Sequence, residues 1–179
     1  MRFMCAAVLA FGIAGATSAQ VAWVGAGWGG SWEWQAPSAP DRTFLHSRDG
    51  VPSVFLALPI DVDTVLRLQA AELPHVKRVI GSDYPGHLRA YTVGIDYLMP
   101  GVFGQALVSA GLGSYKFDLT GGQTLPGHEE TKLGWYAGVG EWFTLTRRSR
   151  VTAEIAVHHS QHEDRPTIVT ASVGLAFGL

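Results

Sequence analysis

Residues 167–179 alternate between two kinds of side chain. One set is largely apolar, and the other is mostly small or polar. Because successive side chains of a β-strand point to opposite faces, this alternation predicts a strand with an apolar surface on one side and a crowded, semi-polar space on the other. The first set is Thr167, Val169, Ala171, Val173, Leu175, Phe177 and Leu179, and the second is Ile168, Thr170, Ser172, Gly174, Ala176 and Gly178.

Seven earlier segments have the same period of two and are separated by residues typical of turns. Together with the last segment they make eight strands of a length that crosses a bilayer at a tilt. The predicted fold is therefore all-β, an eight-stranded antiparallel up-and-down transmembrane β-barrel. The seven segments are 21–34, 51–59, 64–73, 87–99, 102–117, 132–145 and 150–160.

Residues 1–19 have the features of a cleaved signal peptide. Arg2 supplies the positive charge, the apolar stretch that follows is too short to span a bilayer, and small residues at 17–19 form a cleavage site. The barrel domain is then expected to comprise residues 20–179. The chain's single cysteine, Cys5, lies inside the leader, so the exported domain has no disulfide.

The connections between the predicted strands alternate in length, which is typical of outer-membrane barrels with long outer loops and short periplasmic turns. The long connections are expected at 35–50, 74–85, 118–131 and 161–165, and the short ones at 61–63, 100–101 and 147–149. Aromatic residues should form girdles at the two bilayer interfaces. The expected loop-end girdle is Trp28, Trp32, Trp34 and Trp135, and the turn-end girdle is Tyr97, Phe103, Trp142, Phe143 and Phe177.

The sixth segment contains one conflict with this scheme. Strict alternation places Glu141 on the lipid side, where a charge is costly. A β-bulge near Gly138 or Gly140 would turn Glu141 inward and Trp142 outward. We therefore expect a bulge at this point of the strand.

Several stretches resemble the small eight-stranded outer-membrane β-barrel family, typified by the OmpA-like barrel domain. They include TVGIDYLMP at 92–100, AGLGSYKF at 110–117 and GVGEWF at 138–143. The resemblance implies a Gram-negative outer-membrane location, contact with outer-membrane lipid and lipopolysaccharide, and insertion by the barrel-assembly machinery. The end of the chain is similar to the assembly signal of such barrels, through Ser172, Gly174, Phe177 and Leu179. A monomer is expected, and the net charge of −2 argues against nucleic acid as a partner.

Eight strands enclose only enough room for side chains, so an open porin is not expected. The residues predicted to point inward include one arginine and several acids, which should form a polar network because buried charges need partners. A structural or loop-mediated interaction role follows, with a proton or ion path as an alternative. The network residues are Glu33, Arg67, Asp96, Glu141 and Glu154.

Three further hypotheses assign a different activity or place to the chain. His158 and Ser160, with Glu163, resemble the His-x-Ser pair of lipid A deacylases, so a lipid A-modifying hydrolase of the outer leaflet is an alternative to a non-enzymatic barrel. A loop-end group of histidines, His128, His158, His159 and His162, is an alternative candidate for a metal site. A secreted lipocalin-like binding barrel is the third, and it requires an apolar interior. No cofactor is predicted.

Overall fold

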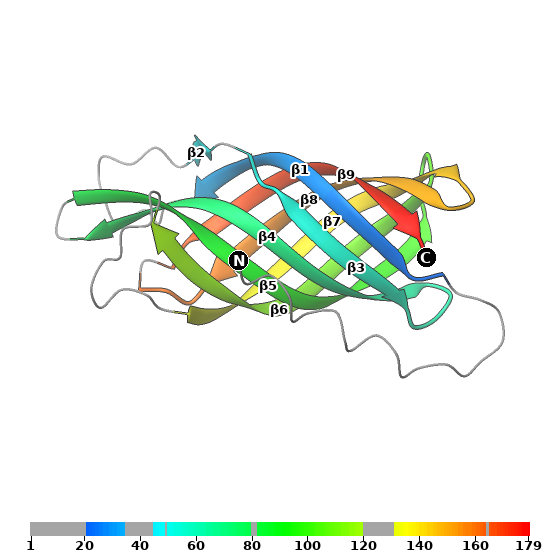
Figure 1. The fold of residues 1–179 in the computed structure, drawn as a ribbon, viewed down its shortest axis with the longest axis horizontal. Helices are drawn as coiled ribbons and strands as arrows, with labels where there is room; N and C mark the ends of the chain where they lie inside the picture. Colours follow the sequence, from blue (N-terminus) through cyan, green and yellow to red (C-terminus); the bar gives the residue numbers. More distant parts are fainter. Residues whose placement is uncertain (1–20, 35–44, 49, 80–81, 120–130, 164) are drawn as a thin grey trace.

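The computed structural model is a closed antiparallel β-barrel, as predicted (Figure 1). It describes residues 21–34, 45–48, 50–79, 82–119, 131–163 and 165–179; the expected signal peptide lies outside them. Each strand from β3 onward pairs with the next, and β1 pairs with β9 to close the sheet. The strands are β1 (Trp23–Trp34), β2 (Leu45–Arg48), β3 (Ser53–Pro59), β4 (Thr64–Val79), β5 (Ser82–Pro100), β6 (Gln105–Leu119), β7 (Thr131–Thr146), β8 (Ser149–Ser160) and β9 (Thr167–Gly178).

Strands β2 and β3 are two parts of one barrel strand. Both pair with the same edge of β1, β3 from Ser53 opposite Gly27 and β2 from Arg48 opposite Ser31. The intervening segment stays attached to β1, because the backbone N–H of Val51 donates to the carbonyl of Gly29 at 2.8 Å. Since β2 adds length to this strand and not a new position in the ring, the barrel has eight strands around its circumference.

The outer surface of the barrel is apolar. A soluble protein would bury most of these side chains, whereas here they form a continuous belt across all the strands. The inner and outer faces follow the predicted alternation, and no helix among the described residues is long and apolar enough to cross a membrane. The exposed belt includes Val24, Val54, Leu68, Tyr91, Val93, Ile95, Val108, Leu112, Val139, Ile155, Val173 and Leu175.

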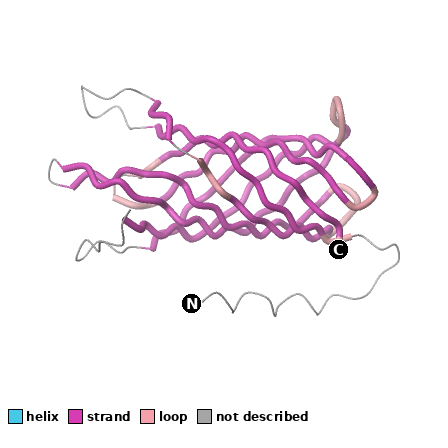
Figure 2. The backbone as a smooth tube through the Cα atoms, turned by 45° about the horizontal axis from the view of Figure 1, so that its top comes forward, coloured by secondary structure: helices cyan, strands magenta, loops and turns pink. Residues whose placement is uncertain are grey.

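The β4–β5 connection differs from the prediction of a long loop at 74–85. Both strands continue through this stretch, and the last pair of the ladder is Val79 with Ser82. The resulting hairpin projects beyond the rest of the barrel, at the end opposite the turns that join β3 to β4, β5 to β6 and β7 to β8 (Figure 2). The loop end of the barrel therefore carries an extended β-hairpin.

The prolines of this hairpin are compatible with strands because of where their nitrogens point. The N–H of Glu72 donates to the carbonyl of Pro52, next to β3, and Pro74 directs its nitrogen to the same edge two residues later. No described strand pairs with β4 there, so no ladder hydrogen bond is lost. Pro85 likewise lies one residue beyond Gly86, where the β5–β6 ladder ends.

The expected bulge near Gly138 or Gly140 is wrong. The pairing of β7 with β8 is regular from Gly134 to Thr144, and the register shifts only between Thr144 and Thr146. Trp142 is consequently buried inside the barrel, with 1% of its surface exposed, and does not belong to the turn-end girdle. Glu141 stays on the outer face, where its Oε1 accepts a 2.7 Å hydrogen bond from the backbone N–H of Phe103.

The position of Glu141 explains why the alternation is not broken. It lies near the turn end of β7, where the cost of a charge on the lipid face is small compared with the middle of the bilayer. Its carboxylate also satisfies a backbone donor of the turn between β5 and β6. The carboxylate thus fixes that turn against the neighbouring strand.

Replacing Glu141 tests this contact. Glu141→Ala should lower the free energy of unfolding by about 1–2 kcal/mol, because the Phe103 N–H loses a charged acceptor. Glu141→Gln retains an acceptor oxygen and should lose less than half of that amount. Urea titration of the protein folded into lipid vesicles measures both. Equal losses in the two variants would show that the charge itself, and not the hydrogen bond, is what matters.

Candidate functional site

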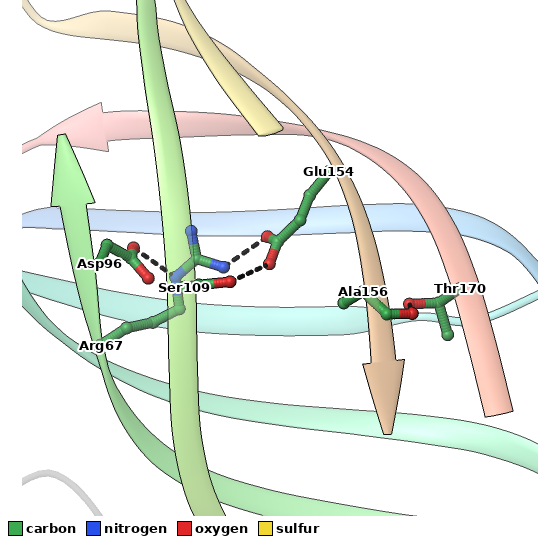
Figure 3. Close-up of polar contacts among 6 residues, drawn as sticks. All are labelled: Arg67, Asp96, Ser109, Glu154, Ala156 and Thr170. Atoms are coloured by element: carbon green, nitrogen blue, oxygen red, sulfur yellow. Dashed lines mark hydrogen bonds and ion pairs between the residues drawn. The ribbon is translucent and has the colours of Figure 1, made fainter. Parts of the chain in front are cut away.

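A layer of charged side chains from β4, β5 and β8 meets inside the barrel (Figure 3). Arg67 of β4 donates through Nε to Asp96 at 2.8 Å and through Nη1 to Glu154 at 2.5 Å. The Oγ of Ser109 donates to the second oxygen of Glu154 at 3.1 Å. Arg67 and Asp96 are completely buried, and Glu154 is 12% exposed. One guanidinium therefore joins carboxylates from two strands, β5 and β8.

Glycines beside this layer leave space for large interior side chains. Gly94 lies directly opposite Arg67 in the ladder, and Gly111 lies opposite Gly94 on the next strand. The ring of Tyr136 covers both glycines, since a Cβ at either would meet it. The guanidinium of Arg67 also lies 5.2 Å from the ring centre of Phe55. The layer is thus packed tightly around the ion pairs.

Two of the acids expected in the network lie elsewhere. Glu33 is buried at the loop end of β1, where its Oε1 is 2.7 Å from Nδ1 of His75 on β4. Glu141 is on the outer face, so the expectation that it joins the interior network is wrong for the register reason given above. The structure brings together Arg67, Asp96 and Glu154 out of the five residues.

Apolar side chains fill the barrel on both sides of the charged layer. Each cluster consists of buried side chains, so the ion pairs lie between two apolar groups among the described residues. The turn-end cluster is Trp23, Phe55, Ala57, Val65, Leu98, Leu107, Trp142 and Ala176. The loop-end cluster is Val51, Ala71, Leu73, Leu88, Ala90, Tyr115, Phe117 and Ile168.

Two interior cations were missed in the sequence. Arg150 has the same parity as Glu154 and His158, so the alternation of its strand already placed it inside. Lys77 lies 5.8 Å from the ring centre of Phe117 and is buried in the β4–β5 hairpin. The strand alternation does not identify Lys77 as an interior residue, because residues 74–85 are expected to form a loop.

The histidine and serine proposed for a hydrolase do not pair with each other. Nδ1 of His158 is 3.2 Å from the hydroxyl of Tyr115, and its ring stacks on Tyr136. The Oγ of Ser160 is instead 2.7 Å from Nδ1 of His162. His158, Ser160 and His162 are all buried inside the barrel, whereas Glu163 is exposed. In the described structure the serine therefore faces the barrel interior and not the lipid side.

The four histidines proposed as metal ligands are not brought together by the described structure. His159 faces outward, with Nδ1 2.8 Å from Oγ1 of Thr167 and its ring 5.6 Å from that of Trp135. His158 and His162 face inward and have the partners given above, and His128 lies outside the described residues. Among the described residues, no three His, Cys, Asp or Glu side chains form a group suited to a metal ion.

The closing strand presents its expected assembly residues on the two faces predicted for them. Phe177 and Leu179 are exposed on the outer surface. Ser172 and Gly174 are on the inner face, where they pair with Gly29 and Gly27 of β1. Strand β9 therefore completes the barrel and contributes to its apolar belt.

Comparison with solved structures identifies the fold. Neisserial surface protein A matches with a TM-score of 0.69 and 12% identity, over 88% of this chain and 97% of that one. The N-terminal β-barrel domain of Pseudomonas aeruginosa OprF matches with a TM-score of 0.58 and 13% identity, over 89% and 98%. Ail, the attachment invasion locus protein of Yersinia pestis, matches with a TM-score of 0.51 and 16% identity, over 88% and 97%. No family model matches the chain, and no curated protein matches its sequence.

The polarity of the barrel agrees with this likeness. The outer surface is an apolar belt, and an ion layer lies inside between two apolar clusters, whereas a lipocalin-like binding barrel has a polar outer surface. The chain has the fold of the small eight-stranded outer-membrane β-barrels, and its outer surface carries a continuous apolar belt.

Proposed function

We propose that the protein is a monomeric outer-membrane barrel with a filled interior, which acts through its structure or through contacts of its loop end, and not as an open porin. The observation that carries this proposal is the Arg67 ion layer held between two buried apolar clusters. A water-filled channel needs solvated side chains along its length. Here Arg67 and Asp96 are completely buried and Glu154 is largely buried, which supports a filled interior.

The loop end is the part of the barrel that offers a surface to partners. The β4–β5 hairpin projects from it, and the exposed side chains of Glu72 and Arg89 lie at the base of that hairpin on its outer side. Ail is named an attachment invasion locus protein, and a role in attachment would suit a barrel with a projecting loop end. Residues 1–19 would direct export as a signal peptide, and Phe177 and Leu179 would serve recognition by the barrel-assembly machinery.

The lipid-facing side supports contact with outer-membrane lipid and lipopolysaccharide. On β5 and β6 the exposed apolar side chains end at Tyr91 and Leu112, and charged residues lie nearer the loops on these two strands and on β4. Among these charged residues Arg89 contacts Glu72 at 3.3 Å and Asp118 at 3.2 Å, and Lys116 lies 3.6 Å from Asp118. Such a change from apolar to charged side chains marks the level of the lipid headgroups.

Conductance across a planar bilayer tests whether the interior is closed. The folded protein, verified by its heat-modifiable migration on a gel, should give no long-lived open-channel current, because the charged layer and both apolar clusters block the lumen. An OmpA-type barrel folded in the same lipid serves as the matched control for insertion. Frequent, long-lived steps of a water-filled pore in the wild-type protein would refute the proposed filled interior.

A further inference from the structure

Arg150 is a cation at the turn-end mouth of the barrel. It is the second residue of β8, where it pairs with Thr144 and Ala176, and its side chain points inward. The guanidinium carbon lies 4.2 Å from the ring centre of Trp23 and 5.1 Å from that of Trp142. The two indoles thus hold the guanidinium by cation–π contacts.

The partners of Arg150 differ from those of Arg67. Arg67 pairs with two carboxylates, whereas the polar contact of Arg150 within the described residues is with the neutral Oε1 of Gln105, at 2.9 Å. No described carboxylate forms an ion pair with Arg150. A partly buried cation of this kind needs an anion or water to compensate its lost hydration.

Two buried donors in the same packed group also have no acceptor. They are Nε of Arg150 and Nε1 of Trp142, and Trp142 is 1% exposed. Both nitrogens can only donate, so neither can satisfy the other. A partner for either nitrogen would have to be an acceptor, and a planar guanidinium suits the oxygens of a carboxylate or phosphate.

The surroundings favour a small anion that enters from the turn end. Arg147 and Arg148 are exposed in the adjacent β7–β8 turn, and the carboxylate of Glu141 on this side faces outward. The acidic β3–β4 turn, with Asp61 and Asp63, is four strands away in the eight-stranded ring and so lies on the opposite wall. Toward the barrel middle the site is closed by the turn-end apolar cluster, which limits the size of a ligand.

We propose that Arg150, Trp142 and Gln105 form a binding site for a small soluble oxyanion, a phosphate or a carboxylate, at the turn-end mouth of the barrel. Arg150 supplies the charge, and the indole N–H of Trp142 supplies a neutral donor. The periplasmic location of this mouth rests on the proposed function. The binding chemistry of the site does not depend on it. Nothing in the site provides for passage of the anion through the barrel.

Titration of the folded full chain in detergent micelles tests the site. The indole N–H resonance of Trp142, assigned by its loss in Trp142→Phe, is followed by NMR while sodium phosphate or sodium acetate replaces sodium chloride at constant ionic strength. A saturable shift with at least one oxyanion is expected. The anion that saturates at the lower concentration identifies phosphate or carboxylate as the preferred chemistry. A linear or absent response to both anions in the wild-type protein overturns the proposal.

Three variants separate a specific site from general attraction to arginine. Arg150→Gln should weaken binding at least about tenfold, because a charge-assisted contact is lost. Arg150→Lys keeps the charge without the planar guanidinium, and its affinity for the anion should lie between those of Arg150→Gln and the wild type. Arg148→Gln removes an exposed charge of the neighbouring turn and should change affinity less than about twofold. Equal loss in Arg148→Gln and Arg150→Gln would also overturn the site. If Arg150→Gln does not fold, Arg150→Lys and the wild-type titration still decide the outcome.

Discussion

Arg67→Ala should destabilise the barrel more than any other single truncation of an interior polar side chain. The substitution leaves Asp96 completely buried and Glu154 largely buried, with no cation between them. Removal of one partner from a buried ion pair costs about 3–5 kcal/mol, because the remaining charge is desolvated and unpaired. We expect the free energy of unfolding, measured by urea titration in lipid vesicles, to fall by an amount in this range.

Neutralising the carboxylates provides the matched control. Arg67→Met combined with Asp96→Asn and Glu154→Gln removes every charge of the layer and keeps side chains of similar volume. A buried ion network replaced in this way is often close to neutral in stability. The triple variant should therefore recover at least half of the stability lost in Arg67→Ala.

Arg67→Ala and the triple variant also test whether the layer has a structural role or forms part of an ion path. If the role is structural, the triple variant folds and gives no long-lived conductance, because the apolar clusters on both sides of the layer are intact. If Arg67→Ala unfolds at the same urea concentration as the wild type, the ion pairs do not stabilise the barrel. That result would contradict the role assigned to them here.

The faces of the strands could be predicted from the sequence because the period of two is a local property. Phe177 and Leu179 point outward and Gly174 points inward for the same reason that Arg67 and Asp96 point inward: each follows from its neighbours in the same strand. The number of strands followed from counting such segments. Closure of the sheet by β1 and β9 then required only that the first and last strands meet.

The partners inside the barrel could not be predicted in this way. Arg67 is on β4 and Glu154 on β8, four strands apart in the ring, so they meet across the lumen and not along the sheet. Strand tilt and stagger decide which inward residues face each other across the lumen. The alternation pattern gives no information about either. Glu33 therefore counted equally as a partner of Arg67, although the structure places it beside His75.

Glu141 and the β4–β5 hairpin show two other limits. The cost of a charge on the lipid face depends on its depth in the bilayer, and an alternation pattern does not indicate how deep a residue lies. The prolines at 74 and 85 indicated a loop, but a proline breaks a ladder only where its nitrogen faces a partner strand. Both errors arose from applying a rule for the middle of a sheet to residues near its ends.

Gly94→Ala tests the packing on which the interior depends. Gly94 lies under the ring of Tyr136, and a Cβ there would be 2.5 Å from the backbone carbonyl oxygen of Ala110 as well as in contact with the tyrosine hydroxyl. Tyr136 is buried, with 1% of its surface exposed, and the carbonyl belongs to the neighbouring strand β6. Overpacking of this kind costs about 1–3 kcal/mol, and we expect the upper part of that range because backbone must move.

Gly30→Ala is the control for the substitution itself, since it adds the same methyl group to a strand glycine. The nearest atom to a Cβ at Gly30 is a ring carbon of Trp32 at 3.9 Å, so the methyl group meets no obstacle. Its effect should lie between zero and a gain of about 1 kcal/mol, because alanine restricts the unfolded chain. Urea titration in the same vesicles compares the two variants, and similar unfolding midpoints would show that the close approach of Tyr136 and β6 to Gly94 is not needed. A large loss of stability confined to Gly94→Ala would mean that the barrel needs a residue without a side chain at position 94, as well as the ion pairs beside it.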